Sequence, residues 1–211
     1  MLNRDRMDAG LIYDPTDSAL ADQQVEALEV LYDYNATRPS QAAEREALLQ
    51  RMFASVGTNC YLEPPLRSNW GGRNVHLGND VYANFNLTLV DDAPIHISDN
   101  VMFAPNVVVA TAGHPVLPEL RRLAAQLNLP VTIGNNVWVG AGALIMPGVT
   151  IGDDSVIGAG SVVTRDIPAG VVAVGSPCRI VREIGEHDRQ FYWRDRQVDI
   201  TVDDYLAGFT S

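Results

Sequence analysis

The chain has 211 residues, and its 26 acidic side chains exceed its 15 basic ones, for a formal net charge of −11 at pH 7. The length allows one domain with a substantial core. The negative charge argues against nucleic acid and anionic membranes as partners. With no long apolar run near the N-terminus, we expect no membrane span or signal peptide. Two cysteines are too few for a disulfide framework, which favours a reducing, cytoplasmic location.

Two helices are expected at the start of the chain. The first spans about Ser18 to Tyr34, with an apolar side formed by Leu20, Leu28, Leu31 and Tyr32. The second follows Pro39-Ser40, where Ser40 is the expected N-cap, and stops at Gly57. We expect this helical segment, residues 1–58, to cap the first coil of the domain that follows, because that coil otherwise exposes a sheet edge.

The main body of the chain has a period of six. Between Val131 and Thr164 an apolar residue returns at every sixth position: Ile133, Val139, Ile145, Ile151, Ile157 and Val163. This period fits neither an α-helix nor an alternating strand. It predicts a coil with three short faces, in which the apolar side chain points inward and Gly, Asn and Asp take the corners. The fold is therefore predicted to be mainly β, a parallel β-helix of hexapeptide repeats.

The repeat extends upstream, with two interruptions. Ile97, Phe103 and Val109 share its phase, whereas Leu77, Ala83 and Leu89 are offset by two residues, so a phase shift falls near Asp91–Ile95. Between Thr111 and Leu129 the pattern is lost. We expect a β-helix over residues 59–177, with a loop extruded from one coil over 111–130, and a C-terminal tail over 178–211. Long loops in compact domains are commonly functional.

His114 is the first candidate for chemistry, because it lies where the coil gives way to the loop. Gly113 precedes it, and Pro115 restricts the backbone after it. A histidine ring titrates near neutral pH and suits a general base. By itself, a single histidine is usually a surface or core residue.

Several segments resemble the galactoside and maltose O-acetyltransferases: TIGNNVWVGAGALIMPGVTIGDDSVIGAGSVVTRDIP, VGSPCRIVREI, ANFNLTLVDD and TAGHP. The resemblance covers nearly the whole chain. It implies a left-handed β-helix, a homotrimer with active sites between subunits, acetyl-CoA as cosubstrate, a small saccharide as acceptor and no metal. The left hand comes only from this resemblance, because general chirality rules favour right-handed crossovers.

The resemblance also assigns roles at the reacting centre. His114 matches the catalytic base, and Asn84 matches an asparagine beside it that holds the acceptor hydroxyl or the developing charge. The acceptor would attack the thioester directly, and the backbone N–H of Ala141 would stabilise the oxyanion. From the spacing alone, the favoured role of Asn84 is that of a corner asparagine of the coil.

For the acceptor, Asp92 resembles a sugar-contacting aspartate, and Asn69 falls where the galactoside enzymes have a serine. Either Asp14 or Asp17 matches a further acceptor-binding aspartate, and a helix N-cap is the alternative role of Asp17. Relatives carry a glutamate in the loop, but the stretch Ala124–Pro130 has no carboxylate. His114 is then oriented by a backbone carbonyl, or by Asp91 or Asp92.

For the coenzyme, the resemblance implies contacts by Trp138 at the thioester, by Ala141 and Ala159 along the pantetheine arm, and by cations at the phosphates. The matching positions near the last coils are Thr164, Arg165, Arg179 and Arg182. Arginine suits phosphate through its bidentate fork. The alternative roles are packing for Trp138 and solvated charges for the arginines.

Three other functions are compatible with the same fold. One is acetyl transfer to a non-sugar hydroxyl or an amine. A second is a zinc enzyme like the γ-class carbonic anhydrases, since His96 and His114 are 18 residues apart and would share a face. The third is a β-helix that only binds a ligand.

Overall fold

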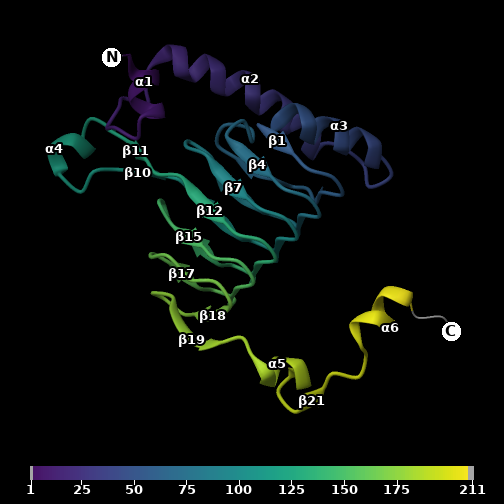
Figure 1. The fold of residues 1–211 in the computed structure, drawn as a ribbon. Coiled ribbons are helices and arrows are strands. Elements are labelled where there is room, and N and C mark those ends of the chain that lie inside the picture. The colour runs from purple at the N-terminus through teal and green to yellow at the C-terminus, as the bar shows by residue number, and fades with distance from the viewer. Residues whose placement is uncertain (1, 209–211) are drawn as a thin grey trace.

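The computed structural model describes residues 2–208 and shows a three-sided parallel β-helix, with helices across one end and a tail at the other (Figure 1). The first face contains β1 (Ser55–Val56), β4 (Val75–Leu77), β7 (Ile95–Ile97), β12 (Val131–Ile133) and β15 (Thr150–Ile151). The second face contains β2 (Tyr61–Leu62), β5 (Tyr82–Ala83), β8 (Met102–Phe103), β13 (Trp138–Val139), β16 (Val156–Ile157), β18 (Val171–Val174) and β19 (Arg179–Glu183). The third face contains β3 (Arg67–Ser68), β6 (Thr88–Val90), β9 (Val108–Ala110), β14 (Leu144–Ile145) and β17 (Val162–Val163).

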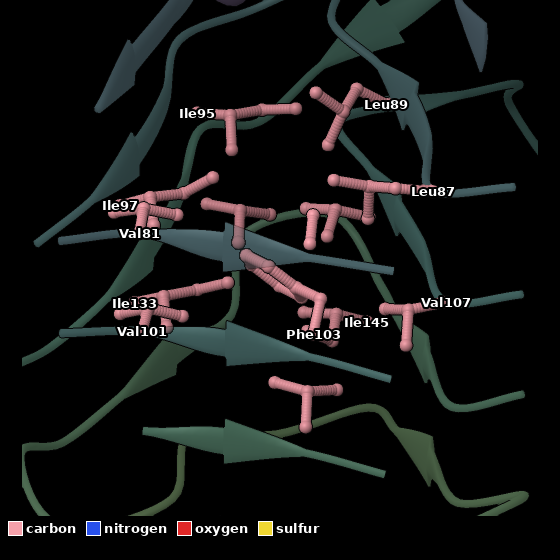
Figure 2. Packing of buried hydrophobic residues seen from close by; sticks show 14 of the residues in the cluster. Val81, Leu87, Leu89, Ile95, Ile97, Val101, Phe103, Val107, Ile133 and Ile145 are labelled. Atoms are coloured by element: carbon pink, nitrogen blue, oxygen red, sulfur yellow. The ribbon is translucent and has the colours of Figure 1, made fainter. Parts of the chain in front are cut away.

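The period of six places the recurring apolar side chain of each hexapeptide in the interior. The predicted inward residues are fully buried: Ile133, Val139, Ile145, Ile151, Ile157 and Val163. Successive coils stack them in register, so that Ile97 lies beside Ile133 and Ile133 beside Ile151. Figure 2 shows Phe103, Ile133 and Ile145 converging within the coil. The predicted core is confirmed.

Corners and close approaches make different demands on the backbone. Left-handed φ angles occur at asparagine and aspartate corners, including Asn86, Asn106, Asn136 and Asp154. Gly152 has a different role, because a Cβ atom there would lie 2.4 Å from the backbone nitrogen of Ala169 in the next coil. The glycines that follow inward residues therefore allow the coils to stack closely.

Three helices precede the coil: α1 (Asn3–Asp8), α2 (Ser18–Asn35) and α3 (Ala42–Met52). α2 begins as predicted. The predictions for α3 were wrong, because its N-cap is Gln41, which makes no side-chain cap bond, and it ends at Met52. The chain then extends to form β1 within the segment expected to be helical. Leu48, Leu49 and Met52 join the main core cluster, so α3 packs against the residues that fill the coil.

The predicted loop leaves the coil after β9 and contains β10 (Ala112–Gly113), α4 (Pro118–Arg121) and β11 (Leu127–Asn128). β10 and β11 pair antiparallel, so the loop begins and ends as a short hairpin. Buried Thr111 ties its base to the coil: its Oγ1 donates to the carbonyl of Val90 at 2.7 Å and accepts from the N–H of Ala93 at 2.9 Å. The loop is thereby fixed at the edge between the third and first faces.

The tail departs from the coil later than expected. β19 pairs antiparallel with β18 and continues the second face, beyond the predicted exit at Pro177. Then follow α5 (Glu186–Gln190), β20 (Phe191–Trp193), β21 (Arg196–Gln197) and α6 (Val202–Ala207). The helix expected over EHDRQFYWRDRQ covers only its first five residues. In the described part of the chain, residues 2–208, no helix is both long and apolar enough to cross a bilayer.

The close stacking at Gly152 gives a test of the coil. We expect Gly152→Ala to lower the free energy of unfolding by about 1–3 kcal/mol, the usual cost of overpacking, because the new methyl group meets backbone that cannot rotate away. Chemical denaturation at fixed protein concentration measures the change. The control is Gly170→Asn, since Gly170 has a φ of +71° and open space around it. An equal loss in both variants would contradict close stacking as the cause.

Candidate active site

An open groove of about 450 Å³ lies along the third face, where the loop leaves the coil. Its lining includes the predicted residues Asn69 and His114, together with Gln126 from the end of the loop. The rest of the lining comes from Arg67, Ser68, Thr88, Leu89, Val90 and Ala112. The loop and the coil thus build this groove jointly.

The ring of His114 is held by the backbone of its own loop. Its Nδ1 lies 2.9 Å from the carbonyl oxygen of Ala125. A carbonyl can only accept, so Nδ1 carries the proton and donates it, which leaves Nε2 of the neutral ring free to take a proton. Of the two predicted ways to orient His114, the backbone carbonyl is correct, because Asp91 and Asp92 bind other groups.

Asp92 is buried behind the groove and organises the side chains that line it. Its carboxylate accepts from Nδ2 of Asn69 at 2.8 and 2.9 Å, from Nε1 of Trp70 at 3.2 Å and from Nε2 of Gln126 at 3.0 Å. A buried carboxylate is stable only when donors surround it. Asp92 therefore fixes Asn69 and Gln126, and its own oxygens point to these donors.

Asp91 has a similar role one residue earlier, at the predicted phase shift. It is fully buried and accepts from Oγ of Ser68 at 2.6 Å and from the N–H of Trp70 at 2.7 Å. Burial raises the pKa of this carboxyl, and those hydrogen bonds oppose the rise. The offset in the repeat thus supplies two buried acids that hold the preceding coil in place.

The N-terminal segment reaches this centre through Tyr13, which the sequence analysis missed. Its backbone N–H and carbonyl both bond to Gln126, at 2.9 and 3.0 Å. Its hydroxyl accepts from the side-chain amides of Gln126 at 2.7 Å and Asn128 at 3.2 Å. Burial raises the pKa of Tyr13 to about 12, so the phenol stays protonated near neutral pH.

The two N-terminal aspartates lie differently. Asp17 caps α2, since its Oδ1 accepts from the N–H of Ala19 at 2.9 Å, and its Oδ2 accepts from Nδ2 of Asn3 at 3.0 Å. Asp14 is exposed and directly follows Tyr13, and among the described residues its Oδ1 binds only the neighbouring Thr16. Asp14 therefore retains an oxygen for a ligand, whereas Asp17 is occupied by the helix start.

A second set of predicted residues lies along another edge, where strands of the second face end. Asn84 follows β5, and its Oδ1 accepts from the N–H of Phe85 at 2.8 Å. Ala141 and Ala159 are exposed in successive coils, joined by the N–H of Gly160 donating to the carbonyl of Ala141 at 2.8 Å. Within residues 2–208, the backbone N–H of Ala141 donates to no protein acceptor.

The second face presents an exposed apolar column. Trp138 is 50% exposed, so the packing role considered for it inside the coil is wrong. In the parallel register, Trp138 lies beside Met102, Met102 beside Tyr82, and Tyr82 beside Tyr61. The side chains of Met102, Tyr82 and Tyr61 are 42–46% exposed. Aligned large apolar groups of this kind commonly mark a binding surface.

The predicted cations lie exposed near the last coils, with different partners. Arg182 forms a bidentate ion pair with Asp188, with both distances 2.7 Å. This pair holds the pKa of Asp188 down at about 2. The Nη1 of Arg179 donates to the carbonyl of Cys178 at 2.8 Å, which leaves its charge without a carboxylate among the described residues. Thr164 and Arg165 are also exposed.

The expected sharing of a face by His96 and His114 is wrong. His96 stacks on His76, with ring centroids 4.7 Å apart on the first face, whereas His114 belongs to the loop. Across residues 2–208, no three or more His, Cys, Asp or Glu side chains are grouped so that they could hold a metal ion.

The predicted residues therefore form two separate clusters. His114, Asn69 and Asp92 gather where the third face meets the first, and Asn84 lies with Ala141 where the second meets the third. In the described chain, Asn84 is not part of the lining of the groove that holds His114. One chain carries both clusters, with the third face between them.

Known proteins match both parts of this architecture. Residues 6–57 match the family model of the maltose acetyltransferase hexapeptide capping motif, and residues 130–165 match that of the bacterial transferase hexapeptide repeats. The galactoside O-acetyltransferase of Escherichia coli K12 is 47% identical over 94% of this chain and 97% of the relative.

Solved structures agree. A galactoside acetyltransferase in complex with coenzyme A is 46% identical, with a TM-score of 0.91 over 95% of this chain and all of that one. A maltose O-acetyltransferase from Clostridium difficile 630 is 41% identical, with a TM-score of 0.86 over 88% of this chain and 99% of that one. The coil, its helical cap and the extruded loop thus belong to a known protein family, and this chain is a member of the galactoside and maltose O-acetyltransferases.

Proposed function

We propose that this protein transfers an acetyl group from acetyl-CoA to a hydroxyl of a small saccharide, with His114 as general base. The observation that carries the proposal is the bond between Nδ1 of His114 and the carbonyl of Ala125, which leaves Nε2 as the basic atom at the groove. The relatives support it, since they include a galactoside acetyltransferase bound to coenzyme A.

The reaction needs no covalent enzyme intermediate. Nε2 of His114 takes the proton of the acceptor hydroxyl as its oxygen attacks the thioester carbonyl. The tetrahedral oxyanion is stabilised by the unpaired N–H of Ala141 and by the amide of Asn84. The carbon–sulfur bond then breaks, and the coenzyme A thiolate takes the proton back from the imidazolium. The products are an acetyl ester and free coenzyme A.

On the acceptor side, Asn69 and Asp14 supply polar contacts, and Asp92 holds Asn69 in position from behind. Asp17 contributes by capping α2, which fixes the segment that carries Asp14. On the coenzyme side, Trp138 backs the thioester, Ala141 and Ala159 leave room for the pantetheine arm, and Thr164 and the arginines contact the phosphates.

The active unit is a homotrimer with sites between subunits. The separation of His114 from Asn84 and Ala141 supports this, because one chain does not bring the base to the oxyanion donors. The apolar column of Tyr61, Tyr82, Met102 and Trp138 supplies a surface for the neighbouring copy to cover. The loop of one subunit then completes the coenzyme edge of the next.

The first prediction concerns the base. His114→Ala is expected to lower kcat by about 10²–10⁴-fold with little change in the KM for acetyl-CoA, because only proton transfer is lost. A thiol-release assay with a saccharide acceptor measures both constants. The control is His96→Ala, whose ring lies on the first face and should leave kcat unchanged. If His114→Ala retains more than half of the activity, His114 is not the base.

The second prediction concerns the coenzyme phosphates. Arg165→Ala and Arg179→Ala are expected to raise the KM for acetyl-CoA by about threefold to tenfold with kcat nearly constant, since this binding is the same in ground and transition states. Arg182→Ala should have a smaller effect, because Asp188 already compensates its charge. Asp188→Asn frees Arg182 and should lower the KM.

A donor comparison separates phosphate binding from general charge effects. The wild type should prefer acetyl-CoA to acetyl-dephospho-CoA, and added salt should narrow the difference. Equal use of the two donors at low salt would show that these arginines are surface charges.

The third prediction concerns assembly. Light scattering should give three times the 23.0 kDa mass of one chain. Met102→Glu places a carboxylate in the apolar column and should shift the protein to monomers and abolish turnover together. His96→Glu, on the first face, is the matched control. Active protein with the mass of one chain would refute shared sites.

A further inference from the structure

We propose that Gln126 binds a second hydroxyl of the acceptor through its side-chain oxygen and so selects which saccharides react. The inference rests on the proposed function and names a specificity residue for the same site. Gln126 lines the groove with His114, and only 8% of its surface is exposed. What matters is which of its amide atoms is accessible.

The amide nitrogen of Gln126 is directed into the protein. It lies 3.0 Å from Oδ1 of Asp92, 2.7 Å from the hydroxyl oxygen of Tyr13 and 3.0 Å from Oδ1 of Asn128. A carboxylate only accepts hydrogen bonds, so the atom facing Asp92 must be the donor, Nε2. Turning the amide over would place two oxygens in contact.

The neighbouring amide is fixed by the same logic. Nδ2 of Asn128 donates to the backbone carbonyl of Asp92 at 3.1 Å, and that carbonyl has no proton to give. Oδ1 of Asn128 therefore faces Gln126 as an acceptor. Both side-chain orientations follow from Asp92, one from its carboxylate and one from its backbone.

The remaining side-chain atom is Oε1 of Gln126. Within residues 2–208 no group donates a hydrogen bond to it, and no buried side-chain oxygen or nitrogen lacks a partner. Oε1 is therefore accessible, and the groove with His114 is the opening that Gln126 lines. A fixed acceptor at that place suits a ligand donor, such as a hydroxyl of the saccharide beside the one that reacts.

The test compares acceptors that differ by one hydroxyl. Methyl galactoside, methyl glucoside and the monodeoxy forms of each are assayed with acetyl-CoA on the wild type and on Gln126→Met, which keeps the length and removes the acceptor. In the wild type, one deoxy form that still reacts should lose about threefold to tenfold in kcat/KM. In Gln126→Met this penalty should disappear, with the parent acceptor reduced to the level of the deoxy form.

The ratio of kcat/KM between the parent and the deoxy acceptor distinguishes a lost contact from a damaged site. A misfolded site slows both acceptors equally and keeps their ratio, whereas loss of the specific bond brings the ratio toward one. Tyr13→Phe supplies a second variant, because it keeps Gln126 but removes one acceptor that holds its nitrogen; it should reduce the ratio partly.

The outcomes are distinct. If Gln126→Met shows the same ratio of kcat/KM between parent and deoxy acceptors as the wild type, Gln126 does not bind the acceptor hydroxyl. The same conclusion follows if no reactive deoxy form loses activity in the wild type. In both cases the acetyltransferase function stands. If the wild type acetylates none of these saccharides, the proposed function fails for them and the inference fails with it.

Discussion

The groove beside His114 depends on one buried carboxylate. Asp92 contributes no surface to that groove, yet its side chain fixes Asn69 and Gln126 and its backbone carbonyl fixes Asn128. A carboxylate removed from water is costly unless donors replace the lost hydration, so the surrounding amides and the Trp70 indole are required by the fold. The same requirement turns Nδ2 of Asn69 and Nε2 of Gln126 toward Asp92, and among these amides it leaves Oε1 of Gln126 for a ligand, since Oδ1 of Asn69 accepts from Gln24 and Oδ1 of Asn128 accepts from Gln126. The hydrogen bonds that stabilise the buried carboxylate of Asp92 thus also set which polar atoms the groove presents.

The loop carries the base because a coil of six-residue steps cannot. Each strand of the coil is two to four residues long, apart from β19, and its side chains either fill the interior or face outward in a column. A side chain that must be placed beyond the surface of these faces requires an insertion in the coil. The hairpin of β10 and β11 supplies it, and Thr111 fixes where it begins. The carbonyl of Ala125 in the returning chain then orients His114 within the same loop, in a stretch that has no carboxylate.

Sequence periodicity predicted what depends on local repetition. The inward residues, the asparagine corners, the start of α2 and the position of the loop follow from spacing and turn preference. The end of α3 was wrong, because pairing of β1 with the coil overrides helical spacing at Ser55 and Val56. Tyr13 and Gln126 were missed because their contact joins residues 113 apart, and no local pattern marks it. The one sequence feature that pointed to Gln126 is the absence of a carboxylate in the stretch before Pro130. The hand of the coil came from the family resemblance alone.

Although the chain is acidic overall, the arginines predicted to bind phosphate all lie near its last coils. With 26 acidic and 15 basic side chains, the long-range field repels a polyanion such as coenzyme A, so close contacts must outweigh it. The exposed arginines lie near the last coils, where Arg179 and Arg182 belong to β19, a strand that follows the final hexapeptides. Asp188 in α5 neutralises only Arg182 among the predicted phosphate contacts. An exposed ion pair contributes little to stability. In the proposed coenzyme site, a phosphate at Arg182 competes with Asp188 for the same guanidinium, so the tail that carries Asp188 affects coenzyme binding.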